Sequence, residues 1–170
     1  MIRKMLTVGL VLAVGSFSTL TSTAVLADGT SKAAGELAIA GSVLLNGTPA
    51  ISGATVFSES TIKTASGNAI VNLGKQGRIE LGPNAEMTVR FTNGSIGGNL
   101  LSGRATVNAP VGVAVSVATA EGTAVSEGKQ PVTLAVDVTC GNTRVAAARS
   151  DAKLVAKNKV EYVAAGATAS

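Results

Sequence analysis

The sequence predicts an all-β protein made of short stacked strands with tight Gly/Asn turns, in either a β-solenoid-like or a sandwich-like arrangement. Apolar and polar residues alternate in short runs, and turn signals recur about every 8–12 residues. Hydrophobic residues make up 46% of the chain, but aromatic residues only 2%. Because aromatic anchors are scarce, we expect small aliphatic side chains to build the core, each of which buries little area.

The N-terminus has the pattern of an export signal. Arg3 and Lys4 precede an apolar run over residues 5–17, and Val25 and Ala27 fit the −3 and −1 positions of a signal-peptidase site. The apolar run is shorter than the roughly 20 residues that a spanning helix needs. We therefore expect a signal peptide and not a membrane span.

Cleavage between Ala27 and Asp28 would remove residues 1–27, and with them two basic residues. The net charge would fall from +4 to +2. Localisation in the periplasm or outside a bacterial cell follows from such a signal. Residues 28–35 are small and polar, and they predict a flexible lead-in.

Residues 36–166 carry the strand pattern. The segment 144–165 has helix-forming composition but alternates over 159–163, so we favour strands there. We expect one β domain over 36–128, a C-terminal β extension of it over 129–166, and a frayed tail at 167–170. The clearest strand runs are residues 78–81, 86–91, 111–117, 132–138 and 159–163, and the clearest turns are at 46–47, 93–94 and 141–142.

The residue inventory argues against an enzyme. The chain contains no His, so the commonest general base and metal ligand is missing. Glu80 and Glu86 are the nearest approach to a paired-carboxylate site, but both fall on the polar side of alternating runs. We expect no catalytic residue, no metal and no cofactor.

Cys140 allows two interpretations. As an unpaired cysteine in an exported chain it could be a reactive thiol or form an intermolecular disulfide. Free cysteines are more often small buried hydrophobes, and we expect that role here.

Nucleic-acid and aromatic-platform carbohydrate sites are not expected. The densest basic group, Lys153, Lys157 and Lys159, has no stacking aromatics around it and suits a solvated strand edge. Beyond the signal, Phe57 and Phe91 alternate toward the core, which leaves Tyr162 as the one exposed aromatic candidate.

The segment from residue 41 to 128 resembles a FecR-type extracytoplasmic domain. The resemblance rests on ordered elements: a strand ending at Asn46-Gly47, the run 64–73, the run 77–87, a Leu-Ser-Gly step at 101–103, and Thr/Gly-Thr elements within 117–125. The matching motif positions are Thr64, Gly67, Ala69, Val71, Leu73, Gly77, Leu81, Gly103, Thr119, Gly122 and Thr123.

The resemblance implies an all-β module in the periplasm or cell exterior that works through contact with other proteins. In the regulators of this family the module relays a signal to a cytoplasmic sigma factor through a membrane helix. A signal peptide before the module leaves no cytoplasmic segment for that role. We therefore expect a non-enzymatic contact module whose partner is an envelope protein or a second copy. The alternative is a self-associating structural or matrix protein, which strand-rich, weakly charged composition also suits.

Overall fold

A computed structural model describes residues 34–156 and 159–170. The predicted signal peptide, its cleavage site at Ala27 and Asp28, and most of the lead-in lie outside these residues. The described part is all-β, as predicted, with one 3-10 turn, η1 (Gly74–Gln76). No helix in this part is long and apolar enough to cross a membrane.

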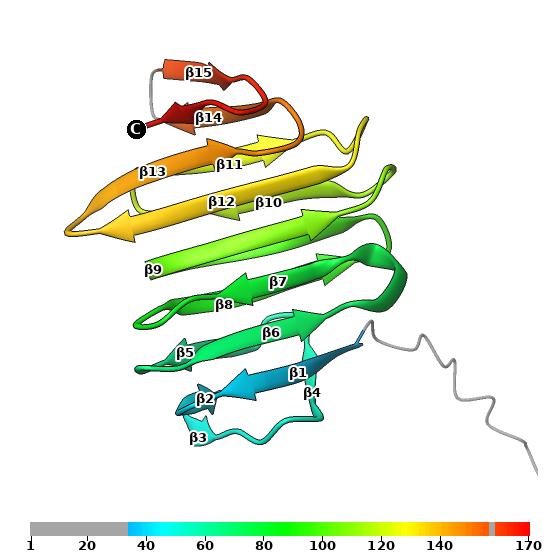
Figure 1. The fold of residues 1–170 in the computed structure, drawn as a ribbon, viewed down its shortest axis with the longest axis vertical. Helices are drawn as coiled ribbons and strands as arrows, with labels where there is room; N and C mark the ends of the chain where they lie inside the picture. The colour runs from blue at the N-terminus through cyan, green and yellow to red at the C-terminus, as the bar shows by residue number, and fades with distance from the viewer. Residues whose placement is uncertain (1–33, 157–158) are drawn as a thin grey trace, which may run out of the picture. The chain divides into compact units, whose positions relative to one another are not determined.

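Sixteen strands form in the described residues, and Figure 1 shows them lying one above another. They are β1 (Ala34–Ala40), β2 (Val43–Leu45), β3 (Thr48–Pro49), β4 (Ala54–Phe57), β5 (Thr61–Thr64), β6 (Asn68–Asn72), β7 (Arg78–Leu81), β8 (Glu86–Thr92), β9 (Ser95–Ala109), β10 (Ala114–Ala118), β11 (Gly122–Ser126), β12 (Val132–Thr139), β13 (Asn142–Ala147), β14 (Ala152–Ala156), β15 (Lys159–Val163) and β16 (Thr168–Ala169).

The strands form two layers joined through β9. Sheet A has the order β4-β1-β6-β7-β9-β12-β13-β16. Sheet B has the order β3-β2-β5-β8-β9-β10-β11-β14-β15. Pairing is antiparallel in every described pair except β9 with β10. The arrangement is therefore sandwich-like, since a solenoid would stack parallel strands.

Strand β9 crosses from one layer to the other. Its first half pairs with β8 and β10 in sheet B, and its second half pairs with β7 and β12 in sheet A. The inward positions are even-numbered up to Leu100 and odd-numbered from Ala105 onward. The register with β8 shifts by one residue at Leu101, which is the signature of a β-bulge. Gly103 follows with φ of +77°.

Small aliphatic side chains fill the space between the sheets. Val and Ala are the commonest buried apolar residues, and the core holds a single Phe and a single Met, Phe91 and Met87. These residues form one continuous cluster drawn from both layers. The predicted small-residue core is confirmed.

The turns lie at the predicted positions 46–47 and, shifted by one residue, near 141–142. Asn46 and Gly47 both have positive φ and join β2 to β3, as the dipeptide predicts. The β12–β13 reversal lies one residue earlier than expected, at Cys140 and Gly141. The strands predicted within 144–165 form as β13, β14 and β15.

Four expectations are wrong in detail. Strand β1 begins at Ala34, inside the expected lead-in, and the expected tail at 167–170 contains β16, in which Ala169 is buried against β13. Phe57 is 46% exposed because Val56 is the residue of β4 that faces the core, which leaves Phe57 on the outer side of sheet A. Cys140 is exposed because its positive φ places it in a turn and not in a strand.

Replacing Gly103 by Ala should destabilise the fold strongly, because a Cβ there would lie 2.6 Å from the Cα of Ala85. Gly47 has a matching φ of +81° but open space around it, so Gly47→Ala isolates the backbone strain. We expect Gly103→Ala to lower the free energy of unfolding by about 1–3 kcal/mol more than Gly47→Ala. Urea denaturation measures both; equal losses would contradict the crossing geometry.

Candidate functional site

The motif positions of the FecR resemblance are structural in this fold. Ala69, Val71, Leu73 and Leu81 point inward and are buried. The Thr64 hydroxyl donates a hydrogen bond to the Gly82 carbonyl at 2.6 Å and accepts one from the Ala85 amide at 2.9 Å. This hydroxyl fastens β5 to the turn before β8, so its role is to hold the two segments together.

The motif glycines lie where neighbouring backbone comes close. A Cβ at Gly67 would lie 2.1 Å from the Ala40 carbonyl oxygen, and one at Gly77 would lie 2.0 Å from that of Asn108. Only glycine fits such approaches without a shift of the adjacent strand. These two positions therefore serve strand packing and offer no side chain for binding.

The motif positions Thr119, Gly122 and Thr123 lie at the turn between β10 and β11, whereas Gly103 lies on β9 just after its bulge. The Thr119 hydroxyl bonds to the Gly122 carbonyl at 3.1 Å, and the Gly122 amide donates back to it at 3.3 Å. The same hydroxyl lies 2.9 Å from that of Thr143 on β13, which links the two sheets. Thr123 follows on the outer face of sheet B. The motif residues are thus spread along the stack and do not converge on a pocket.

Glu80 and Glu86 do not form a carboxylate pair. Glu80 lies on β7 of sheet A and is ion-paired with Arg78. Glu86 lies on β8 of sheet B, and one of its carboxylate oxygens is 2.9 Å from the Lys63 ammonium. Both point outward from opposite layers. In the described part of the chain, no three His, Cys, Asp or Glu side chains come together as metal ligands would.

The largest exposed apolar side chains that share one surface lie at the C-terminal end of sheet B. On the outer side of β14 and β15, Val155 pairs across with Val160, and Lys153 pairs with Tyr162. Val155, Val160 and Tyr162 are 42%, 50% and 74% exposed. The Lys153 ammonium lies 5.7 Å from the centre of the Tyr162 ring, within cation–π range. We call these four residues the Tyr162 face.

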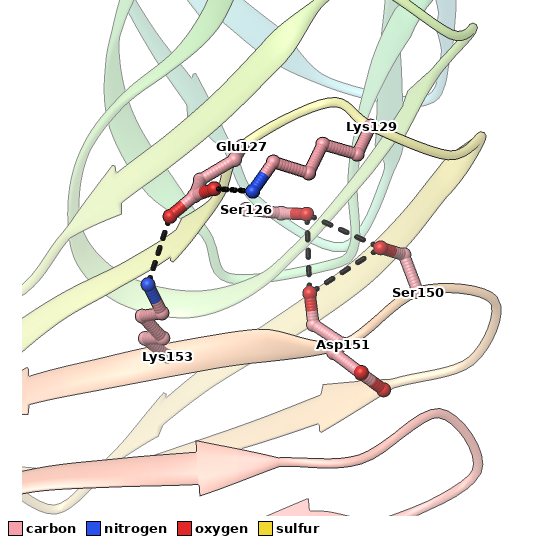
Figure 2. Close-up of polar contacts among 6 residues, drawn as sticks. All are labelled: Ser126, Glu127, Lys129, Ser150, Asp151 and Lys153. Atoms are coloured by element: carbon pink, nitrogen blue, oxygen red, sulfur yellow. Dashed lines mark hydrogen bonds and ion pairs between the residues drawn. The ribbon is translucent and has the colours of Figure 1, made fainter.

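A polar groove of about 310 Å³ borders the Tyr162 face. Figure 2 shows its charged wall, where the Glu127 carboxylate lies 2.6 Å from the Lys129 ammonium and 2.8 Å from that of Lys153. The bond from Lys129, followed by the bond from Lys153, lowers the pKa of Glu127 from 4.5 to about 2. The carboxylate therefore keeps Lys153 in place beside Tyr162 at any neutral or mildly acidic pH.

The serines in Figure 2 are engaged in the fold. The Ser126 and Ser150 hydroxyls are buried, lie 3.4 Å apart, and each donates to the Asp151 carbonyl oxygen. The Asp151 carboxylate in turn accepts the Ala165 amide at 3.0 Å. These bonds tie β11, the start of β14 and the loop after β15 into one rigid corner, with no base positioned to activate a serine among the drawn residues.

Both end strands at this end have a free side. Among the described strands, β15 pairs only with β14 and β16 only with β13. Beside β14 and β15 an opening of about 150 Å³ is lined by the apolar residues Leu154 and Ala156, by the charged residues Glu121, Lys159 and Glu161, and by Thr143 and Ser170. Lys159 and Glu161 lie 3.2 Å apart and point toward this opening. Among residues 34–156 and 159–170, no further strand covers this end of the two-layer core.

Sequence reasoning identified part of this site. The exposure of Tyr162 is confirmed, and Lys159 lies on the end strand β15 as expected. Lys153 lies on β14, which pairs with both β11 and β15, so the expected strand edge is wrong for this residue, and Lys157 lies outside the described residues. The grouping of Tyr162 with Val155 and Val160 was missed, because it depends on the register between β14 and β15. The sequences of β14 and β15 do alternate between inward and outward residues, but this alternation does not say which outward residues lie opposite each other.

No family model matches the chain, and no curated protein matches it.

Native Cys140 should react rapidly with a thiol reagent, because its side chain is exposed in the β12–β13 turn. One equivalent of thiol should be titrated in buffer, at a rate that unfolding in urea raises little. Labelling that requires unfolding would place the thiol inside the core.

The Glu127 carboxyl should titrate near pH 2, and the Glu127–lysine contacts should be complete above pH 4.5 and lost as the pH falls through about 2. Lys129→Met should raise this pKa more than Lys153→Met, and Lys75→Met on the η1 turn should leave it unchanged. Carbon-detected NMR titration measures all four proteins. A wild-type midpoint near 4.5 would contradict the charged wall.

Proposed function

We propose that this protein is an exported bacterial FecR-like β module that acts, without catalysis, by protein–protein contact at the cell envelope. The observation that carries the proposal is the Tyr162 face beside the unpaired side of β15. Three large apolar side chains gathered on one surface are typical of an interaction site. Tyr at such a place combines apolar area with a polar tip, which suits protein contacts.

Strand addition is the contact mode that this end of the fold favours. The free side of β15 carries backbone amide and carbonyl groups that a partner strand can pair, while the Tyr162 face supplies side-chain contacts to that partner. Within the described residues the motif positions and acidic side chains already serve the fold or surface ion pairs. This distribution of roles supports contact over catalysis.

The export and family parts of the proposal rest on the sequence. The N-terminal pattern over residues 1–27 supports delivery across a membrane. The order of motif elements from 41 to 128 supports the FecR-like assignment, and the close approaches at Gly67 and Gly77 give those motif positions a physical purpose.

Photo-crosslinking tests the contact surface in producing cells. A photoreactive phenylalanine analogue replaces Tyr162 or, as the matched control, Leu101, which is a 53% exposed apolar residue on β9 in the middle of the stack. We expect discrete higher-mass adducts from position 162 and few from position 101. Equal adduct patterns from both positions, or none from 162, would contradict a contact site at β15.

The processed N-terminus tests the export part. Protein recovered from the periplasm or the medium should begin at Asp28 when its N-terminus is sequenced. A chain that keeps residues 1–27 and stays in the cytoplasm would refute the proposed location. Ala27→Arg should block processing, because a large charged side chain does not fit the −1 position.

A further inference from the structure

Strand β15 has two different sides around its free backbone edge. Val160 and Tyr162 point outward, whereas Lys159, Glu161 and Val163 share the inward side with Leu154 and Ala156 on β14. Val163 is buried, but Lys159 and Glu161 lie at the opening between the sheets. Any strand that pairs with β15 must therefore meet both charges.

Inward-pointing charges on an end strand normally prevent pairing. An apolar partner strand would leave the Lys159–Glu161 ion pair, whose charged groups lie 3.2 Å apart, in a less hydrated place with no opposite charge from the partner, which is unfavourable. A partner that presents a carboxylate opposite Lys159 and an ammonium opposite Glu161 avoids this penalty. The charge pattern thus disfavours pairing with most strands. It favours a strand that has an acidic residue opposite Lys159 and a basic residue opposite Glu161.

A second copy of β15 that runs antiparallel to the first has its acidic and basic residues in these positions. We propose that two copies of the chain pair antiparallel through β15, with Lys159 of each copy opposite Glu161 of the other and the two Val160 residues facing each other on the two-fold axis. This inference rests on the proposed function and names its partner as a second copy.

The charges also fix the register. A shift of two residues in either direction would place Lys159 opposite Lys159 or Glu161 opposite Glu161, and like charges directly opposite are destabilising. A shift of one residue would set a charged side chain opposite Val160 and turn the two sandwiches to opposite sides. Only the proposed register keeps the two sandwiches on the same side of sheet B and both charges paired.

The same register also brings apolar side chains of the two Tyr162 faces into contact. The two Val160 side chains come into direct cross-strand contact, and each Tyr162 lies diagonally from Val160 of the other copy, within reach of an aromatic ring. Val155 extends this apolar strip on each side. The Tyr162 face of one copy thereby continues into that of the other.

The assembly closes at two copies. A two-fold contact uses β15 of both chains, so neither offers that edge again. At the opposite end of sheet B, β3 spans only Thr48–Pro49, and proline lacks the amide that a ladder needs. Sheet B thus offers no further ladder edge once two copies have paired, and we expect a dimer.

Sedimentation equilibrium of the purified protein with charge-reversed variants tests the pairing. Lys159→Glu and Glu161→Lys each create two like-charge contacts and should raise the dimer dissociation constant about tenfold. The double variant Lys159→Glu/Glu161→Lys restores opposite pairs and should restore the dimer. Arg78→Glu, which reverses a charge in a similar pair on the interior strand β7, should leave it unchanged.

Cysteine crosslinking tests the register in a Cys140→Ser background. Val160→Cys should form an intermolecular disulfide on mild oxidation, because the two residues face each other on the axis. Tyr162→Cys should form far less, because position 162 of the other copy lies four residues further along the strand. Efficient crosslinking at 162 in place of 160, or double-reversal that fails to restore association, would overturn the proposed register.

Two outcomes separate this inference from the proposed function. A monomer at all concentrations, with adducts from position 162 to a different protein, would refute the second copy and keep the contact function. A dimer that the single charge reversals weaken and the double reversal restores, with adducts only between copies, would confirm the pairing and refute a separate envelope partner.

Discussion

The rest of the structure depends on one strand that belongs to both layers. Strand β9 holds two neighbours in sheet B and two others in sheet A, so neither sheet can form its centre without it. The bulge at Leu101 and the left-handed backbone at Gly103 turn the inward side of the strand from even to odd positions. This crossing allows a core of small side chains to be shared, which compensates for the few large anchors.

The same construction explains why the ends of the stack differ from its middle. An interior strand pairs on both sides, and its outward residues form ordinary surface ion pairs such as Lys63 with Glu86, each of which contributes little stability. No described strand pairs with the outer side of β15, and this strand carries both exposed apolar residues and inward charges. Any specific interaction at this edge must satisfy both features, and that requirement connects the fold to the proposed contact function.

The sequence predicted the parts of the fold that depend on local chemistry. Alternation located the strands at 78–81 and 132–138, the Asn46-Gly47 dipeptide located a turn, and the small-residue composition described the core. The misplaced features depend on neighbours distant in sequence. Phe57 lies on the outer side of β4 because Val56 faces the core, and Cys140 follows a regular strand but occupies its turn. The Tyr162 face required the β14–β15 register, which no local pattern specifies.

Native-state hydrogen exchange followed residue by residue tests the central role of β9 most directly. Amides in both halves of β9, on either side of Gly103, should exchange only through global unfolding and with the same free energy. Those of β15 should exchange much faster in dilute protein, through local opening. If the sheet A half of β9 exchanged through a separate, lower-energy opening than the sheet B half, the two layers would not depend on a shared strand, and the account would be contradicted.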